Sequence, residues 1–249
     1  MLVIPAIQIR NGRCVQMVQG MEGHGHSDDP VEMARLWRIE NAKTLQVSDM
    51  DGLQEGRLVN VEVIRRMVRC VDIPIELGGG LWTYDAVAHA LDLGLYRVVV
   101  GAMIVENPDE AQRAINTFGP SKTVLGIDAV DGIVAERGRS RSTHLTAMTV
   151  ALNAKLMGFR RIEYTELRTD GTLRGVNIGI LRELATKTGM RITASGGITS
   201  LEELLQIQEL ASVGVDSVVI GRALYENRFS CQQLWRHCES RNYPYTAKV

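Results

Sequence analysis

Two polar side chains stand at matching places in the chain, each directly after a short apolar run. Gln8 lies in PAIQIR, and Asp128 lies in LGIDAV, 120 residues further on. The amide of Gln8 offers a carbonyl acceptor and two N–H donors, but it cannot store a proton at any accessible pH. An α/β enzyme usually displays a catalytic side chain at such a place. The acid–base chemistry therefore lies elsewhere, or a working part has been lost.

Glycines form a second repeated feature. The pairs are Gly79 and Gly80 in ELGGGLW with Gly196 and Gly197 in ASGGITS, and Gly101 in VVVGAM with Gly221 in VVIGRA. Glycine lets a ligand reach bare backbone N–H groups, and a helix that begins just after it favours an anion. Each set resembles half of a phosphate-binding site. In the alternative interpretation, these glycines only close tight turns between strands and helices.

The elements that would position these residues are short β-branched runs alternating with amphipathic stretches. Strands are expected at Leu2–Ile7, Thr44–Ser48, Ile73–Leu77, Arg97–Gly101, Thr123–Ile127, Arg161–Tyr164, Arg191–Ala194 and Ser217–Ile220. Helical patterns lie between them, such as PVEMARLWRIENA and SLEELLQIQELA, the latter with Thr199 or Ser200 as its N-cap. This alternation predicts an α/β fold, a (β/α)8 TIM barrel with parallel buried strands. A doubly wound open sheet is the alternative.

The repeat divides the barrel into two similar halves. We expect one domain over residues 1–240, with half-barrels of about 1–120 and 121–240, and a C-terminal tail at 241–249 without an assigned function. In a barrel of this kind, chemistry belongs at the carboxyl ends of the strands, where the repeat places its polar residues and glycines.

Composition narrows the class of protein. The chain has 249 residues, 45% of them hydrophobic and 23% charged, and a net charge of −1, so no basic field indicates nucleic acid. No apolar run reaches the roughly 20 residues that span a membrane, and no signal peptide is visible, which predicts a cytoplasmic protein. The four cysteines form no C-x-x-C pair, and His24 and His26 lie in a Gly-rich loop, so we expect no metal.

Longer motifs carry a resemblance that runs from Met1 to about Phe229. They are IPAI, GRCVQMVQG, SDDP, SDMDG, ELGGG, VENP, GIDAVDG, YTELRTDGT, ASGGI and VIGRALYE. With these motifs the chain resembles the phosphoribosylformimino-5-aminoimidazole carboxamide ribotide isomerase family of histidine biosynthesis. The resemblance implies an Amadori rearrangement of a ribonucleotide-like substrate with two phosphate ends, without metal or organic cofactor.

The resemblance also implies roles for individual residues. Asp128 matches the general acid, Thr165 a residue that orients the substrate, and Asp170 an assisting loop residue. One phosphate would be bound by Gly196, Gly197, Gly221 and Arg222. Gln19, Asp49, Trp82 and Arg139 are expected as further ligand contacts.

Departures from the family pattern gather in the first half. Gln8 replaces the Asp that acts as general base, a loss that typically costs roughly 10²–10⁴-fold in rate. Asp49 or Asp51 could substitute, with loop capping as the alternative. The remaining departures are Leu81 and Trp82 in place of a phosphate-binding Arg, Ala102 and Met103 in place of a hydroxyl, and RGRS, with Arg137, Arg139 and Arg141, in place of an RGW-like segment.

Three functional hypotheses follow. The protein is an isomerase of this pathway or of a related compound, or it is a non-catalytic paralogue that binds one phosphorylated ligand in its second half. In the third, it is a different enzyme on the same scaffold, in which Trp82 stacks on a ring. A monomer is favoured, because a barrel of two halves needs no partner to close.

Overall fold

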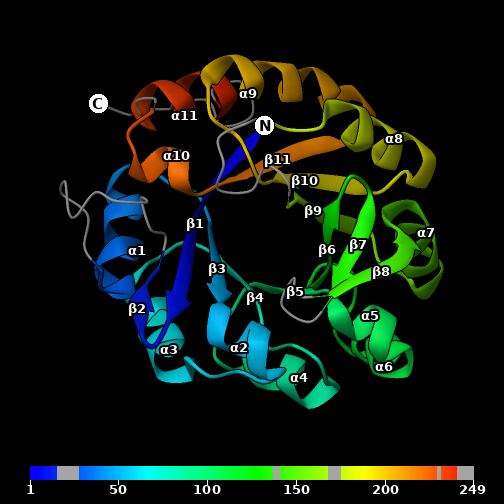
Figure 1. Ribbon diagram of the computed structural model, residues 1–249. Helices are drawn as coiled ribbons and strands as arrows, with labels where there is room; N and C mark the ends of the chain where they lie inside the picture. The colour runs from blue at the N-terminus through cyan, green and yellow to red at the C-terminus, as the bar shows by residue number, and fades with distance from the viewer. Residues whose placement is uncertain (16–27, 137–140, 168–174, 229–230, 240–249) are drawn as a thin grey trace.

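A computed structural model of the protein describes residues 1–15, 28–136, 141–167, 175–228 and 231–239. Within these residues, eight parallel strands close into a barrel (Figure 1). In order round the barrel they are β1 (Leu2–Arg10), β3 (Leu45–Asp49), β4 (Ile75–Gly78), β5 (Arg97–Val100), β6 (Thr123–Val130), β9 (Arg161–Glu166), β10 (Arg191–Ser195) and β11 (Val215–Ile220). The predicted barrel is confirmed. The open-sheet alternative is wrong, because β5 pairs with β6 and β11 with β1, which leaves no edge.

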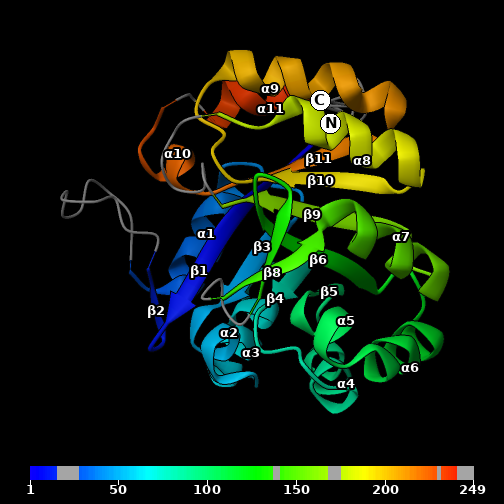
Figure 2. The ribbon, with the colours of Figure 1, turned by 45° about the vertical axis from the view of Figure 1, so that its right-hand side comes forward.

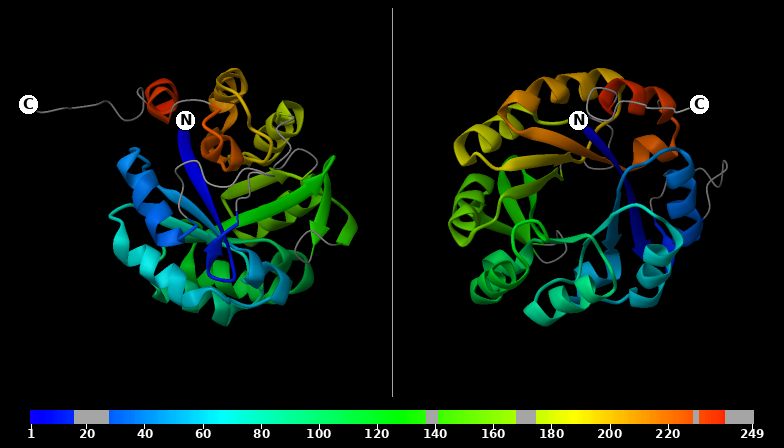
Figure 3. Two further views of the ribbon diagram at one scale, coloured as in Figure 1. Left: turned by 60° about the vertical axis from the view of Figure 1, so that its left-hand side comes forward. Right: turned by 180° about the vertical axis from the view of Figure 1, so that it is seen from behind.

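The helices form a ring outside the strands, seen from the front in Figure 1, obliquely in Figure 2 and from behind in Figure 3. They are α1 (Pro30–Ile39), α2 (Met50–Glu55), α3 (Val61–Cys70), α4 (Tyr84–Asp92), α5 (Ala102–Glu106), α6 (Pro108–Phe118), α7 (Ala147–Met157), α8 (Ile178–Thr188), α9 (Leu201–Gln208), α10 (Arg222–Tyr225) and α11 (Cys231–Glu239), with a 3₁₀ turn, η1, at Glu209–Val213. None of the helices in the described part of the chain is long and apolar enough to cross a membrane.

Helix starts follow the chemistry of their first residues. Ser200 is the N-cap of α9, and its hydroxyl accepts a hydrogen bond from the backbone N–H of Glu203. The Glu203 carboxylate in turn accepts from the N–H of Thr199 at 2.7 Å, so each group satisfies a donor that the helix leaves unpaired. Asp29 caps α1 in the same way, ahead of Pro30 at the first helical position.

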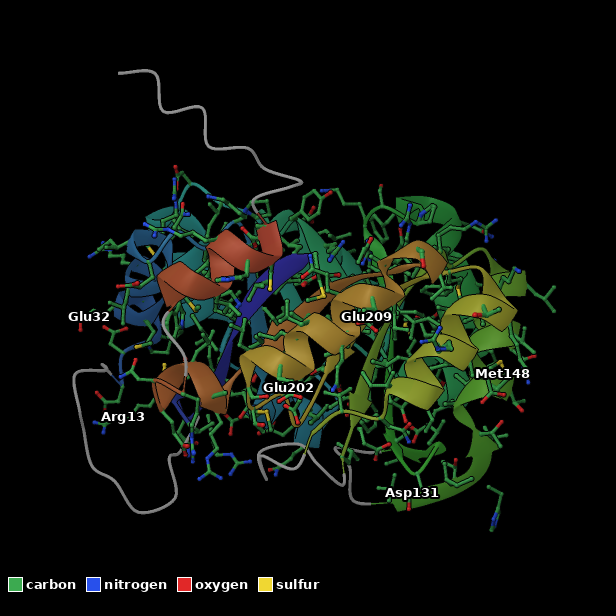
Figure 4. All side chains as sticks on the ribbon, turned by 90° about the horizontal axis from the view of Figure 1, so that it is seen from above. Arg13, Glu32, Asp131, Met148, Glu202 and Glu209 are labelled. Carbon is green, nitrogen blue, oxygen red and sulfur yellow. The ribbon has the colours of Figure 1, made fainter. Side chains whose placement is uncertain are left out.

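Short antiparallel strands were not predicted. β2 (Arg13–Cys14) folds back on β1, and β7 (Ile133–Glu136) folds back on β6 and continues into β8 (Arg141–Thr146). Figure 4 labels Arg13 and Asp131 on these two hairpins, and both lie toward the same side of the barrel. The hairpins occupy equivalent places in the two halves, so the repeat extends beyond the strands.

Buried apolar side chains fill the layer between strands and helices. Inside the barrel the apolar filling is small, a cluster of Ile4, Ala6 and Val219 with Leu2 against it. The interior also holds polar side chains that are nearly inaccessible to solvent, namely Gln46, Glu76, Glu163, Thr193 and Ser217. An interior of this kind is rigid only if its polar groups pair with one another, because an unpaired buried charge is costly.

The two ends of the described chain meet beside β1. The N-terminal ammonium of Met1 donates to the carbonyl oxygen of Cys238 at 2.8 Å, and the N–H of Val3 donates to the Glu239 carboxylate at 3.0 Å. Helix α11 therefore ties the last part of the second half to the first strand of the first half. Burial raises the pKa of Glu239 to about 7, although Val3 and the charge of Lys43 oppose that shift.

Candidate active site

A cavity of about 770 Å³ opens at the carboxyl ends of the barrel strands. It is lined by residues from every one of the eight strands or from the turns that follow them. Twelve of the predicted site residues line it, namely Gln8, Asp49, Gly79, Gly80, Trp82, Gly101, Asp128, Thr165, Gly196, Gly197, Gly221 and Arg222. Gln19, Asp170 and Arg139 lie outside the described residues. The cavity thus gathers predicted site residues that are separated by up to 214 positions in the chain, from Gln8 to Arg222.

Gln8 and Asp128 lie on opposite sides of this cavity. β1 and β6 are four strands apart in either direction round the closed sheet. Asp128 is in register with Thr165 on β9, and Thr165 is in register with Ser195 on β10. Gln8 is in register with Ser48 on β3. The site therefore has a carboxylate with hydroxyl neighbours on one wall and an amide with a hydroxyl neighbour on the other.

The paired glycines of both halves share one backbone shape. Gly79 and Gly80 have φ of +94° and +75°, and Gly196 and Gly197 have φ of +87° and +77°, values that favour glycine. A Cβ on Gly196 would also come within 2.8 Å of the Glu166 carbonyl oxygen, and one on Gly79 would overlap the Asp49 carbonyl. Tight closure therefore demands glycine at both places, whether or not a phosphate binds there.

Arg222 begins α10 directly after Gly221 and lines the cavity. Its Nε donates to Glu226 at 2.5 Å, and the guanidinium of Arg228 donates to the other oxygen of the same carboxylate at 2.8 Å. Burial raises the pKa of Glu226, but the hydrogen bonds from the two arginines outweigh it and the net pKa is lowered. Glu226 thus holds the Arg222 side chain in a defined position at the cavity wall.

Asp49 is fully buried and braces the loop that follows α2. Its Oδ1 accepts from the N–H of Gly52 at 2.9 Å and from the Asn60 amide at 2.7 Å, and its Oδ2 accepts from the N–H groups of Val59 and Asn60 at 2.8 and 3.0 Å. A carboxylate offers about four lone-pair sites, so these four donors occupy it. This geometry favours the structural interpretation over the role of a substitute base.

Asp51 supports the turn after β1. Its Oδ2 accepts from the N–H of Asn11 at 2.6 Å and from the Asn60 amide at 2.8 Å, and it is not among the residues that line the cavity. The second half has an equivalent support, since Glu166 accepts from the N–H of Asp131 at 3.2 Å. These contacts favour a structural role for Asp51 as well.

Trp82 lies half-buried where the cavity meets α2. Its ring covers Gly56, at which a Cβ would come within 2.8 Å of the indole. The Trp82 carbonyl oxygen accepts from the Asn107 amide at 3.4 Å. The indole therefore packs on the α2 C-cap and also lines the site, and its role in stacking on a ligand stays a prediction.

Metal-ligating side chains do not cluster in the part of the chain that the structure describes. No group of three or more His, Cys, Asp or Glu side chains within the described ranges is placed to hold a metal ion. Cys14, Cys70 and Cys238 are free thiols. His24 and His26 lie outside the described residues.

Two residues at the cavity floor were missed by sequence reasoning. Gln46 and Glu163 face each other inside the barrel, and the Gln46 Nε2 donates to the Glu163 Oε1 at 3.4 Å. They are 3% and 9% exposed. A signal was present, because each precedes a cavity residue, Ser48 or Thr165, by two positions and a strand places such residues on the same face.

Comparison with known proteins now identifies the family. A family model described as "Histidine biosynthesis protein" matches residues 2–230. The chain belongs to the histidine biosynthesis protein family. It is 44% identical to the 1-(5-phosphoribosyl)-5-((5-phosphoribosylamino)methylideneamino) imidazole-4-carboxamide isomerase of Chlorobium phaeobacteroides (strain BS1), over 96% of this chain and 93% of that protein. Identity to the isomerase of the same name from Salinibacter ruber is 46%, over 94% of this chain and 92% of that protein.

The residues expected to depart from the family pattern lie together in space. Gln8, Trp82 and Ala102 all line the cavity from the first half of the chain. Asp128 and Arg222, which are expected to match the family pattern, line it from the second half. That the cavity differs from the family on one side stays a prediction.

Proposed function

We propose that the protein catalyses the Amadori rearrangement of a phosphoribosyl aminoimidazole carboxamide intermediate in histidine biosynthesis. The observation that carries this proposal is the pairing of Asp128 with Thr165 on neighbouring strands at one wall of a 770 Å³ cavity. The isomerases named above act on a substrate with two phosphoribosyl groups, and the near full-length similarity to them supports the same reaction here.

One phosphate of the substrate binds at the second half. Gly196, Gly197 and Gly221 expose backbone N–H groups at the cavity, and Arg222 adds a charged donor that Glu226 holds in place. Charge-assisted hydrogen bonds of this kind are about twice as strong as neutral ones. The other phosphate lies toward Gly79, Gly80 and Gly101 of the first half, with Gln19 and Arg139 as further contacts.

The reaction begins with proton donation. Asp128 in its protonated form gives a proton to the ribose ring oxygen, the bond from that oxygen to C1′ breaks, and an iminium forms between C1′ and the exocyclic nitrogen. A base then removes the proton from C2′, and the C–H electron pair forms the C1′=C2′ double bond of an enaminol. Loss of the proton on the 2′-hydroxyl oxygen and protonation of C1′ give the aminoketose, with no net change in atoms.

Gln8 and Thr165 contribute hydrogen bonds to this sequence. The Thr165 hydroxyl orients the substrate beside Asp128, Asp170 assists, and the Gln8 amide binds a substrate hydroxyl from the opposite wall. No cofactor enters any step. The protein acts as a cytoplasmic monomer, consistent with a barrel that closes within one chain.

Isomerisation of the purified substrate tests the proposal. The wild-type protein is expected to convert the aminoaldose to the aminoketose without added metal or cofactor, and Asp128→Asn is expected to abolish most of the rate. A rate equal to background that is also unaffected by Asp128→Asn would refute the isomerase. A non-catalytic paralogue would in that case still show ligand-dependent thermal stabilisation.

A further inference from the structure

The proposed isomerisation needs a group that accepts the C2′ proton, and Gln8 cannot do so. Among the described residues that line the cavity, the carboxylates are Asp49, Asp128 and Glu163. Asp49 is occupied by four donors, and Asp128 serves as the acid. Glu163 is the carboxylate that the proposed chemistry has not used.

Glu163 lies one layer below Thr165 on the same face of β9. Its neighbours in register are Gly126 on β6 and Thr193 on β10. Gly126 has no side chain, and the Val99 side chain packs over it, with Cγ1 2.9 Å from where a Cβ would stand. Glu163 therefore forms part of the cavity floor, next to Gly126 on the strand that carries Asp128.

An amide donor and a cation lie near the buried Glu163 carboxylate. Gln46 donates to it from the opposite half. The cation is Arg97. Burial lowers the pKa of its guanidinium, but the charges of Glu76 and, more weakly, of Glu163 raise that pKa, and the net pKa is raised. The charge that Arg97 shares with Glu76 thus also stabilises the anion of Glu163, which is the form that a base requires.

The side-chain oxygen of Gln46 offers an acceptor to a ligand at the cavity floor. Its Oε1 is buried and has no hydrogen-bond partner among the described residues, although it lines the cavity. A buried acceptor without a donor is costly, by about 1–3 kcal/mol. A substrate hydroxyl or a bound water at the floor would supply that donor, directly beside Glu163.

We propose that Glu163 is the general base of this isomerase, in place of the Asp that is expected at the first-strand position where this chain has Gln8. The inference rests on the proposed function. The Glu163 carboxylate takes the proton from C2′ of the open-chain iminium, and the C–H electron pair becomes the C1′=C2′ bond. The same carboxyl then returns its proton to C1′ as the 2′-hydroxyl becomes the ketone and releases its own proton to water.

A structural role for Glu163 makes different predictions. In that case the residue is one member of a buried polar network with Gln46 and Arg97, and its loss lowers stability without selecting a chemical step. Glu76 provides the matched control, because it is a buried glutamate inside the same barrel, paired with Arg97, and it is not among the cavity-lining residues.

The experiment measures kcat, KM and the pH dependence of kcat/KM for wild type, Glu163→Gln, Glu76→Gln and the double variant Gln8→Asp with Glu163→Gln. Glu163→Gln is expected to lower kcat by roughly 10²–10⁴-fold with little change in KM, and to remove the acidic limb of the pH profile. Glu76→Gln is expected to lower the melting temperature while keeping kcat. The double variant is expected to regain turnover, because the carboxylate introduced by Gln8→Asp restores a base at the family position.

Each contrary result has a defined meaning. A wild-type kcat in Glu163→Gln would overturn the assignment of Glu163 as the base. Equal losses of kcat in Glu163→Gln and Glu76→Gln would overturn it as well. So would a pH profile that loses its acidic limb in Asp170→Asn but keeps it in Glu163→Gln. If Glu163→Gln unfolds at the assay temperature, Glu163→Asp replaces it: reduced kcat with the acidic limb retained supports the base, and unchanged kcat overturns it. A wild-type protein without turnover would refute the proposed function itself.

Discussion

The two halves of the barrel share a backbone plan. Each begins with a strand that ends in a two-residue turn, Asn11-Gly12 in the first half and Asp131-Gly132 in the second, all four residues having positive φ. In each, an acidic side chain from the carboxyl end of the neighbouring barrel strand accepts from the first N–H of that turn: Asp51 lies just after β3, and Glu166 is the last residue of β9. The turn conformation and the acidic side chain that accepts from it are therefore repeated in the two halves.

The side chains that face the cavity differ between the halves. The three contrasting pairs, first half before second, are Gln8 with Asp128, Gln46 with Glu163, and Ala102 with Arg222. Each first-half member is an amide or a methyl group, and each second-half member is an ionisable side chain. The fold therefore constrains the backbone of both halves equally, whereas the ionisable groups of these three pairs lie in the second half.

Asp128→Asn tests the difference between the two halves most directly and has the largest expected effect on turnover. Removing the acid should lower kcat by roughly 10²–10⁴-fold. Gln8→Ala removes only hydrogen bonds, worth about 1 kcal/mol, and should lower kcat/KM by about fivefold. Steady-state kinetics check both, and similar losses in the two variants would show that the halves contribute equally.

Arg222→Ala tests the charged contact of the second half. Loss of a hydrogen bond from a charged group, about 1.5–3 kcal/mol, should raise KM about 10- to 100-fold with a smaller change in kcat. Arg228→Ala is the matched control, because Arg228 pairs with the same Glu226 yet its side chain is 52% exposed and does not line the cavity. An equal rise in KM for both variants would show that the rise comes from disturbing Glu226, not from losing a contact between Arg222 and the substrate.

Asp49→Asn and Glu166→Gln each change a carboxylate that accepts hydrogen bonds from backbone N–H groups, one in each half. Both are expected to change stability more than turnover. Asp49→Asn turns an N–H₂ group toward buried N–H donors and should cost about 2–4 kcal/mol. Glu166→Gln retains an acceptor for Asp131 and should cost less, about 1 kcal/mol. Urea unfolding measures the free energies, and equal costs would mean that the Asp49 hydrogen bonds are not the source.

Glu239→Gln tests the contact between α11 and β1 and should leave turnover unchanged. Its pKa is raised by burial from 4.5 to about 7. A raised carboxyl pKa contributes stability that is fully present below the unfolded value and is lost as the pH rises through the folded value, which is about 7 here. Thermal melting from about pH 5 to about pH 8 should therefore show a decline that Glu239→Gln flattens. An unchanged decline in Glu239→Gln would assign the pH dependence to other groups.

The eight barrel strands and the glycine turns beside the cavity followed from local signals. β-branched runs at regular spacing predict eight strands, because side-chain period and element length are local properties, and the glycines at 79, 80, 196 and 197 mark turns that require positive φ. The positions of the half-barrel boundaries, the role of each site residue and the monomeric state stay predictions. The additional hairpins were missed, because β7 and β8 are short and lack a strong apolar pattern.

By itself, the sequence determined the family and the alternation of strands and helices, and it placed the amide of Gln8 in the first strand. Only the tertiary structure decided what surrounds each carboxylate. Asp49 and Glu163 both lie in buried strands and both line the cavity, yet Asp49 accepts four hydrogen bonds from Gly52, Val59 and Asn60, whereas Glu163 accepts one from Gln46 across the barrel. Those surroundings come from chain segments far apart in sequence. The availability of a proton acceptor depends on such contacts, which no local pattern encodes.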